Sequence, residues 1–466
     1  MSHQAPSSLQ DEIVFQDPAE FWTYIQNSLI CDTPQDPQVV NTKLVAYLKI
    51  VADHINIYVN DDQDLYRCGL SLVNSEIYEN NKVFCLAKSL SILSISDELI
   101  STDFKYFISY VILLDCKNDA SVLDILEDYH GFVIIATNVR SIFHNLALLS
   151  RDDLGESKGS TISCLKNSAT VQLDILFQMC KFLSLKTEDL AVIDEFFVNY
   201  IFESLIVAYN EEDIFNSAKF KIILALNEQF MVLTRENKAF ANVVFQSLKN
   251  HRHTARNFNE CLLVYFNRES DRCLQIMISK LLYLIFTDAI TSDLFYHNDL
   301  NVLVDVVLRE LTDMSEDEET TRTTFLRILH IILNTKQITS TKYRKNELRA
   351  LLLFLSGQCS SFWEVSDQTK RLALKCLAIS WLAEETPPPE YASVVITSSS
   401  PTPESLTATE KIKEKLQYEV APQTLNVLQK DINNSDTSLN SMSKKRPPPP
   451  VPRRSFGVSS SNLMGR

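Results

Sequence analysis

The stretch NRESDRCLQIMISKLLYLIFT (267–287) is followed by HNDLNVLVDVVLRELTDM (297–314) and by TRTTFLRILHIILNT (321–335). In all three, apolar residues recur three or four positions apart, as in a helix that buries one face. Polar and charged residues fill the opposite face of each pattern. The block therefore predicts three consecutive amphipathic helices.

The middle stretch also carries signals for where its helix begins and how its outer face is paired. Asn298 stands where an N-cap residue belongs. Asp305 and Arg309 are four positions apart with the acid first, which is the favourable order for an ion pair on one helix. We expect a helix that is capped by Asn298 and carries this pair on its outer face.

Similar helical patterns extend outward from this block over residues 18–385, with short polar connections between them. One longer loop is expected at 151–163, and one of the later helices is expected at 187–208. Only 7 of the 466 residues are Gly, whereas about 30 would be present at average usage. This scarcity disfavours sandwiches, barrels and nucleotide-binding α/β folds. We therefore predict an all-α, armadillo-like helical solenoid, with an irregular helical domain as the alternative.

The two ends of the chain differ in composition from this helical region. Residues 1–17 are polar, and we expect them to be disordered. Residues 386–466 begin with a linker rich in Pro, Ser and Thr and continue into a tail that has too few apolar residues to form a core. We expect this C-terminal part to be mostly disordered.

The tail contains the sequence KKRPPPPVPRR at residues 444–454. Such a proline run favours the polyproline II helix, which SH3 domains bind in an aromatic groove beside an acidic pocket. Cations flank the prolines at both ends, so the segment fits both binding orientations. The alternative is a tail that binds nothing. The predicted SH3-binding residues are Arg446, Pro447, Pro448, Pro449, Pro450, Pro452, Arg453 and Arg454.

The net charge of −15 argues against nucleic acid as a partner. The apolar runs are interrupted by charges such as Lys280, so we expect no membrane span and no membrane insertion. The N-terminus lacks the basic start and apolar core of a signal peptide. No pair among the ten cysteines is spaced as Cys-x-x-Cys, which favours reduced thiols in a helical core. These features predict a cytoplasmic protein.

Signals for catalysis or for a cofactor are weak. Gly155 and Gly159 are the only close glycine pair, and Lys158 precedes the second of them instead of following it, so a phosphate-binding loop is not indicated. His251 and His253 lie near Cys261 and could in principle bind a metal, but a solvated basic surface is the expected role. We predict no enzyme activity, no cofactor and no metal site.

Charged and polar residues off the apolar stripes of the block are candidates for a docking surface. A basic cluster just after the block could contact an acidic partner surface. The alternative is that these side chains form ion pairs between helices. The candidates are Asn301, Asp305, Arg309, Arg322, Arg327, His330, Lys342, Arg344, Lys345 and Arg349.

Two runs within the block, Asn298–Asp305 and Leu326–His330, resemble the leucine-rich domain of the DIP/WISH family. The resemblance is specific over 267–335 and extends more weakly from about 39 to 382. It implies an armadillo-like fold. It also implies activation of the actin-related protein 2/3 complex without a pre-existing filament, producing linear seed filaments at cortical or endocytic actin patches.

Other activators of that complex end in an acidic tail with a tryptophan. Here Trp22, Trp363 and Trp381 all fall in predicted helices, and the end of the chain is basic. Any action on actin is therefore expected from the folded body, with SH3 proteins of the endocytic machinery as partners of the tail. The alternatives are a helical adaptor without effect on actin and, remotely, an enzyme with a divergent active site.

Overall fold

The computed structural model describes most of the helical region. The described residues are 15–31, 36–95, 100–150, 158–206, 213–238, 240–251, 253, 255–358 and 365–383. The chain divides into two compact units, Met1–Glu410 and Lys411–Arg466, and every described residue belongs to the first. The predicted tail and its proline run lie outside the described residues.

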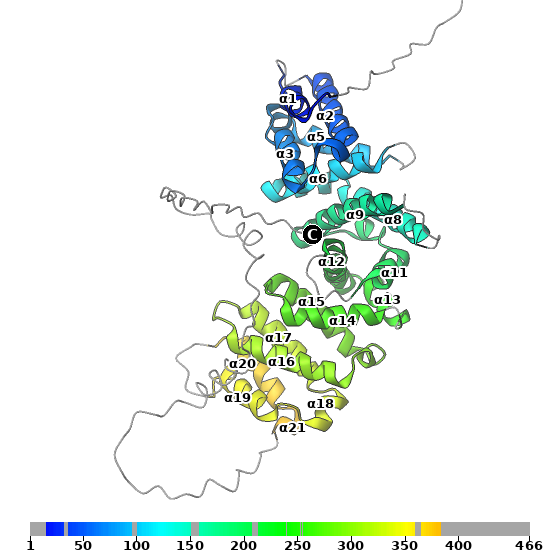
Figure 1. Ribbon diagram of the computed structural model, residues 1–466. Helices are drawn as coiled ribbons and strands as arrows, with labels where there is room; N and C mark the ends of the chain where they lie inside the picture. Colours follow the sequence, from blue (N-terminus) through cyan, green and yellow to red (C-terminus); the bar gives the residue numbers. More distant parts are fainter. Residues whose placement is uncertain are drawn as a thin grey trace, which may run out of the picture. The chain divides into compact units, whose positions relative to one another are not determined.

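The described residues form α-helices and one short 3-10 helix, and they contain no strand (Figure 1). The prediction of an all-α fold is therefore confirmed. The helices of the N-terminal half are α1 (Pro18–Ser28), α2 (Pro37–Tyr58), α3 (Asp62–Val73), α4 (Glu76–Asn80), α5 (Lys82–Leu93), α6 (Thr102–Asn118), α7 (Ser121–Asp128), α8 (Gly131–Leu149), α9 (Lys158–Phe182), α10 (Thr187–Leu190) and α11 (Glu195–Ser204). Those of the C-terminal half are α12 (Ile214–Glu236), α13 (Val243–Asn250), α14 (Ala255–Arg268), α15 (Arg272–Thr287), η1 (Ser292–Leu294), α16 (His297–Asp313), α17 (Glu319–Ile332), α18 (Lys336–Thr341), α19 (Lys345–Leu355), α20 (Asp367–Leu377) and α21 (Ser380–Ala383).

The main helices pack in two rows that follow the chain. In the first row, α2, α6, α9, α12, α15, α17 and α20 each contact the next member. In the second row, α5, α8, α11, α14, α16 and α19 do the same. Each second-row helix also packs on the first-row helix that follows it closely in the sequence, such as α8 on α9 and α16 on α17. This succession of stacked helix pairs is the predicted helical solenoid.

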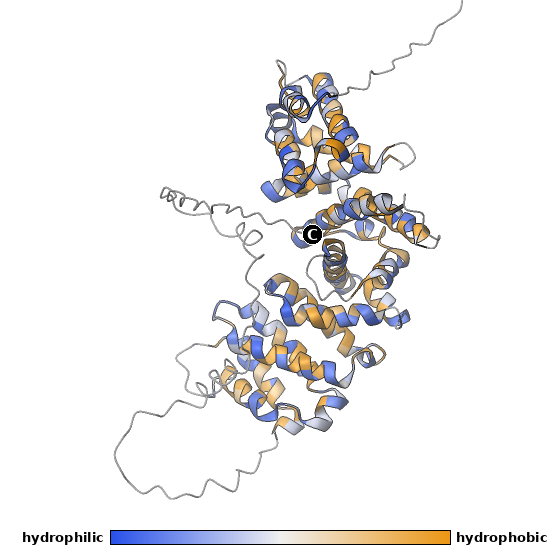
Figure 2. Ribbon diagram, in the orientation of Figure 1, coloured by the Kyte–Doolittle hydropathy of each residue, from blue (hydrophilic) through white to orange (hydrophobic). Residues whose placement is uncertain are grey.

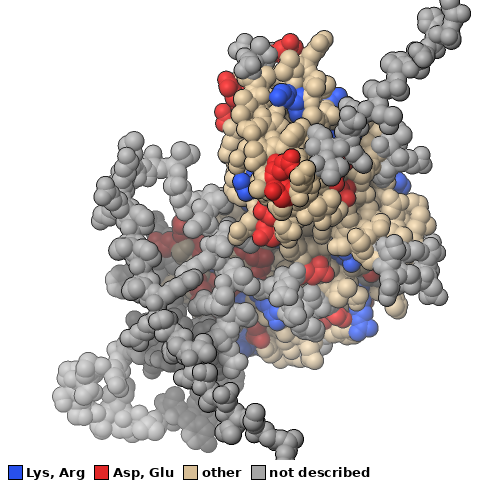
Figure 3. Space-filling view, turned by 45° about the horizontal axis from the view of Figure 1, so that its top comes forward, with Lys and Arg blue, Asp and Glu red and all other residues tan. Residues whose placement is uncertain are grey.

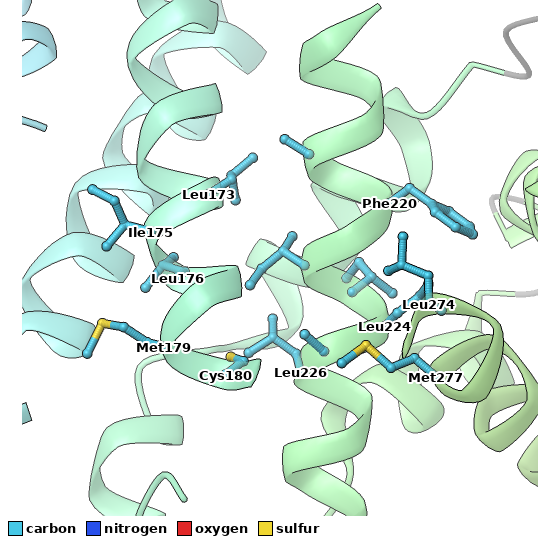
Figure 4. Packing of buried hydrophobic residues seen from close by; sticks show 14 of the residues in the cluster. Leu173, Ile175, Leu176, Met179, Cys180, Phe220, Leu224, Leu226, Leu274 and Met277 are labelled. Atoms are coloured by element: carbon cyan, nitrogen blue, oxygen red, sulfur yellow. The ribbon is translucent and has the colours of Figure 1, made fainter. Parts of the chain in front are cut away.

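The core is continuous along the first row, because each helix there is apolar on the faces that meet its neighbours (Figure 2). Figure 4 shows one such junction, in which Leu173 and Leu176 of α9, Leu224 of α12, and Leu274 and Met277 of α15 are all buried. Burying a side chain of this size stabilises the fold by about 1.5–3 kcal/mol. Row packing of this kind accounts for the helical periodicity of the sequence.

Two of the predicted boundaries are wrong. Helix α9 begins at Lys158, so residues 158–163 of the predicted loop are helical. A glycine costs about 1 kcal/mol in a helix interior. That cost lowers the helical signal around Gly159, although packing of α9 on α6, α8 and α12 overrides it. The predicted helix at 187–208 is divided into α10 and α11.

Helix α8 is, among the described residues, the one helix long and apolar enough to cross a membrane by length and composition. This corrects the expectation that no run reaches that length. Four of its large side chains, Phe132, Ile135, Val139 and Phe143, are buried among neighbouring helices. Core helices pass the same test of length and composition, and α8 contacts α5, α7, α9, α10 and α11. Its composition is therefore explained by packing within the solenoid.

The described cysteines are free thiols, and most of them are buried in the helical core, as predicted. Burial disfavours the thiolate, so it raises the pKa of a buried thiol. Burial, followed by the negative charge of Asp64, raises the pKa of Cys68 to about 12. Burial also raises the pKa of Cys85 and of Cys376 to about 12. In an unfolded chain these thiols would ionise near their ordinary value of 9.0.

We expect the protein to lose stability as the pH rises above about 9. Between that pH and about 12, unfolding releases protons from these thiols, and each contributes up to about 1.4 kcal/mol per pH unit. Burial lowers the pKa of Lys219 to about 8, so this lysine alone would make the protein more stable as the pH rises to its ordinary value of 10.5. It is one group against several buried thiols. Urea unfolding at about pH 8 and about pH 10 measures the change. In the Cys85→Ala variant the free energy of unfolding should fall less between these two pH values. Equal urea midpoints for the intact protein at both pH values would contradict the expectation.

Candidate functional site

The predicted central block forms α15, α16 and α17, which pack together through their apolar stripes. Leu303 and Val304 of α16 and Phe325 and Leu329 of α17 are fully buried. The cap of α16 differs from the prediction, because the helix begins at His297. The backbone N–H of Tyr296 donates to the Asp299 carboxylate at 3.0 Å, so the side chain of Asp299, and not that of Asn298, caps the N-terminus of α16.

Arg272 at the start of α15 joins the three helices electrostatically. Its Nη1 lies 2.6 Å from Oε2 of Glu310 on α16, and its Nε donates to Glu318, just before α17. Burial alone would raise the pKa of Glu318, but hydrogen bonds from Ser315 and Arg272 outweigh it and lower this pKa. The connection between α16 and α17 is therefore fixed by charged hydrogen bonds.

Arg322 on α17 is fully buried, so the prediction that it is an exposed docking residue is wrong. Its guanidinium donates to Oε2 of Glu319 at 3.0 Å and to the backbone oxygen of Ser315. Glu319 in turn accepts a hydrogen bond of 2.8 Å from Thr369 on α20. Arg322 lies one turn before Phe325 on the same face of α17. Its hydrogen bonds compensate for the burial of its charge in the interior.

Asp305 and Arg309 do not pair with each other, contrary to the expectation from their spacing. Asp305 accepts a hydrogen bond of 2.9 Å from the hydroxyl of Tyr343, and it lies 3.1 Å from Nε of Arg344. Arg309 instead donates to the side-chain and backbone oxygens of Asn267, at 3.1 and 3.0 Å. Tertiary partners on other elements thus replace the weak pairing within one helix.

The turn between α18 and α19 has an unusual backbone. Lys342 and Arg344 both adopt a φ of 51°, in the left-handed region that non-glycine residues rarely occupy. The contacts of Tyr343 and Arg344 with Asp305 hold this conformation. Such backbone strain is concentrated at functional sites, so the turn with its exposed Lys342 is a candidate contact point.

The remaining docking candidates divide between exposed and internally engaged side chains. Arg327 on α17 is exposed. His330 is partly buried, and burial followed by the nearby positive charge of Lys375 lowers its pKa. Arg349 donates to the backbone oxygen of Leu382 at 2.7 Å. Asn301 and Lys345 are partly buried.

The structure therefore brings Asp305, Tyr343 and Arg344 together, and it separates the other candidates over α16, α17 and α19. Tyr343 was not predicted from the sequence, because nothing in its neighbourhood indicates a contact with a residue 38 positions earlier.

Signals for other chemistry have structural explanations. No group of three or more His, Cys, Asp or Glu residues among the described residues could hold a metal ion. His251 Nε2 lies 2.9 Å from Glu195, an ion-pair distance when the imidazole is protonated. Trp381 is buried and donates to the backbone oxygen of Leu333. Trp363 and the SH3-binding residues 446–454 lie outside the described residues.

Two adjoining hollows form a groove along the N-terminal half of the first row. Their volumes are about 470 Å³ and about 1100 Å³, and they share Asp62, Tyr106, Ser163 and Asn167. We call this the tyrosine groove. It is lined by the end of α2, by α3, α6 and α9, and by the start of α12. Its charged and aromatic residues are Asp61, Asp62, Asp103, Tyr106, Tyr110, Lys117, Lys166, Asp174, Asp213 and Phe215.

Comparison with known proteins gives the strongest evidence of relationship. Residues 212–348 match the family model "SPIN90/Ldb17, leucine-rich domain", and this match encloses the whole block 267–335. Protein LDB17 of Eremothecium gossypii is 40% identical over 370 residues, which cover 76% of this chain and 80% of that protein. The chain belongs to the SPIN90/Ldb17 family. The resemblance inferred from 267–335 is thereby confirmed.

Two further relatives define the extent of this family likeness. Protein LDB17 of Saccharomyces cerevisiae is 35% identical over 445 residues, covering 88% of each chain. Protein dip1 of Schizosaccharomyces pombe is 29% identical over 219 residues, covering 46% of this chain and 59% of that one. Among solved structures, an engineered protein covers 79% of this chain at 10% identity with a TM-score of 0.37, which is too low to carry an argument.

Proposed function

We propose that this protein activates the actin-related protein 2/3 complex and so nucleates linear seed filaments without a pre-existing filament. In this proposal it works in the cytoplasm at cortical and endocytic actin patches, where SH3-domain proteins recruit it through residues 444–454. The observation that carries the proposal is membership of the SPIN90/Ldb17 family, whose leucine-rich domain spans α12 to the start of α19. The family resemblance implies a role in the actin pathway of that complex.

The mechanism is differential binding. A helical surface that binds the active arrangement of the complex more tightly than the inactive one shifts the population toward activity. Each tenfold preference corresponds to about 1.4 kcal/mol. The exposed Arg327 and the turn at Lys342 offer positive charge for such a surface. Arg272 and Arg322 are instead paired with Glu310 and Glu319 between and within the helices.

The second candidate function is a helical adaptor that connects SH3 proteins to another partner without affecting actin. The proline run with its flanking arginines favours it. Both functions use the same tail, and they differ in what the solenoid does.

Assembly of pyrene-labelled actin separates the two functions. We expect the full chain, with the actin-related complex and no added filaments, to shorten the lag, and microscopy should show mostly unbranched filaments. Arg327→Glu should weaken binding to the complex about tenfold, because it reverses an exposed charge on α17. Lys49→Glu, an equal change at an exposed position of α2, is the matched control and should leave assembly unchanged.

A lag unchanged by the intact protein would favour the adaptor. The variant with Arg446, Arg453 and Arg454 all changed to Glu should keep its activity in solution and lose capture by SH3 domains. Loss of solution activity in that variant would instead make the tail part of the activator.

A further inference from the structure

The tyrosine groove combines aromatic and acidic side chains. Tyr106 and Tyr110 lie one helical turn apart on α6, and both face the groove with Asp62 of α3. Burial, and next the negative charge of Asp62, raise the pKa of each tyrosine to about 12. These two partly buried rings therefore stand close to an exposed carboxylate.

Carboxylates extend along the whole groove. Five of its lining residues are aspartates and two are lysines, so its charge is negative. Asp174 lies toward α12, and burial raises its pKa despite the opposing charges of Lys221 and Lys117. Figure 3, which brings the α1–α6 part forward, shows acidic side chains in patches on that side of the protein.

Aromatic rings beside carboxylates are the features that recognise a polyproline helix with flanking cations. The rings pack against proline, and the carboxylates bind arginine through charged hydrogen bonds. The groove was not predicted from the sequence, because its residues come from five separate helices. Its one sequence signal is the pair Tyr106 and Tyr110, which share the less buried side of α6.

The chain itself contains a segment of matching chemistry. Residues 444–454 carry five prolines between basic residues, and they belong to a protein whose net charge is −15. About 60 residues separate Ala383 from this segment, and an extended chain of that length can span up to about 200 Å. Charge and length both permit the segment to act as a ligand for the groove.

We propose that the tyrosine groove binds the proline-rich segment 444–454. The rings of Tyr106 and Tyr110 receive the prolines, and Asp62 binds a flanking arginine. The same segment is the proposed ligand of SH3 domains, so the groove and an SH3 domain would compete for it. The inference does not depend on an action on actin.

The test uses the full chain in which Arg446, Arg453 and Arg454 are changed to Glu, so that its own segment cannot compete. A fluorescent peptide with the sequence KKRPPPPVPRR should bind this protein, as measured by fluorescence anisotropy. Adding Asp62→Lys should weaken the affinity at least tenfold, and Tyr106→Leu should weaken it as well. Asp128→Lys, an equal charge change at an exposed position of α7 outside the groove, should change it less than twofold.

Two outcomes would overturn the proposal. One is absence of binding, or binding that Asp62→Lys and Asp128→Lys reduce equally. The other is equal binding of a peptide in which alanine replaces every proline, since simple charge attraction would then suffice. Circular dichroism and thermal unfolding of each variant establish that the fold is retained, and Asp62 is exposed at the start of α3, so its replacement spares the core.

Discussion

Leu303→Asp is expected to unfold the helical domain. Leu303 has 0% exposure at the centre of α16, where its side chain packs in the apolar stripe between neighbouring helices. A carboxylate placed there would be buried without a partner, which costs several kcal/mol beyond the lost apolar contacts. That cost is comparable to the whole stability of an ordinary domain, about 5–15 kcal/mol. Far-UV circular dichroism follows the loss of helix on heating.

The neighbouring Val302 supplies the matched control. Its side chain is 36% exposed, so Val302→Asp adds the same charge to the same helix one position away, on its outer side. We expect this variant to melt within a few degrees of the unmodified protein. If Leu303→Asp also retained its melting temperature, the stripe of α16 would be an exposed surface and the packing described above would be wrong.

Arg322→Ala is expected to destabilise the protein by about 1.5–3 kcal/mol, the usual cost of losing hydrogen bonds to a charged group, since the Glu319 side chain is 36% exposed and would not become a buried unpaired charge. The substitution removes the donor to Glu319 and to the backbone oxygen of Ser315, and it leaves a cavity under the start of α17. Urea denaturation with the linear extrapolation measures the change in unfolding free energy. A fall in the midpoint without a change in slope is the expected result.

Arg327→Ala is the control for this experiment. Arg327 lies on the same helix, five positions further, but it is exposed, so its truncation should change the unfolding free energy by less than about 0.5 kcal/mol. Equal effects of the two substitutions would contradict the interior position of Arg322. For binding to the actin-related complex we expect the reverse: Arg327→Ala should weaken it, whereas Arg322→Ala should not weaken it directly, because Arg322 is buried.

Helical periodicity predicted the solenoid well because apolar side chains face the core at every third or fourth position of each helix. The sequence was less informative about charged side chains. Arg322 stands three and seven positions before Phe325 and Leu329, on the face of the stripe, and it is buried against Glu319 despite its charge, whereas Arg327 on the same helix is exposed. Asp305 has Arg309 at the right spacing, but its partners come from a turn almost forty residues later. Such choices depend on tertiary distances that local spacing does not contain.

The candidate site was predictable to a similar degree. The block 267–335 indicated the family, since its pattern is long and specific. The positions of exposed charge could be found only after the rows of helices were known. The tyrosine groove required the same knowledge, because α3, α6, α9 and α12 each contribute a few residues to it.

The two-row arrangement has a mechanical consequence. The contacts of each main helix are local: they join it to its row neighbours, to helices of the other row close to it in sequence and to short helices beside it, so a pulling force is transmitted largely from one helix pair to the next in series. The compliances of the successive junctions then add, as in springs joined end to end. A protein built in this way can stretch slightly at every junction under load without losing any one helix, and it returns when the load is removed. A globular core with contacts between distant parts of the chain would instead resist and then rupture in one step.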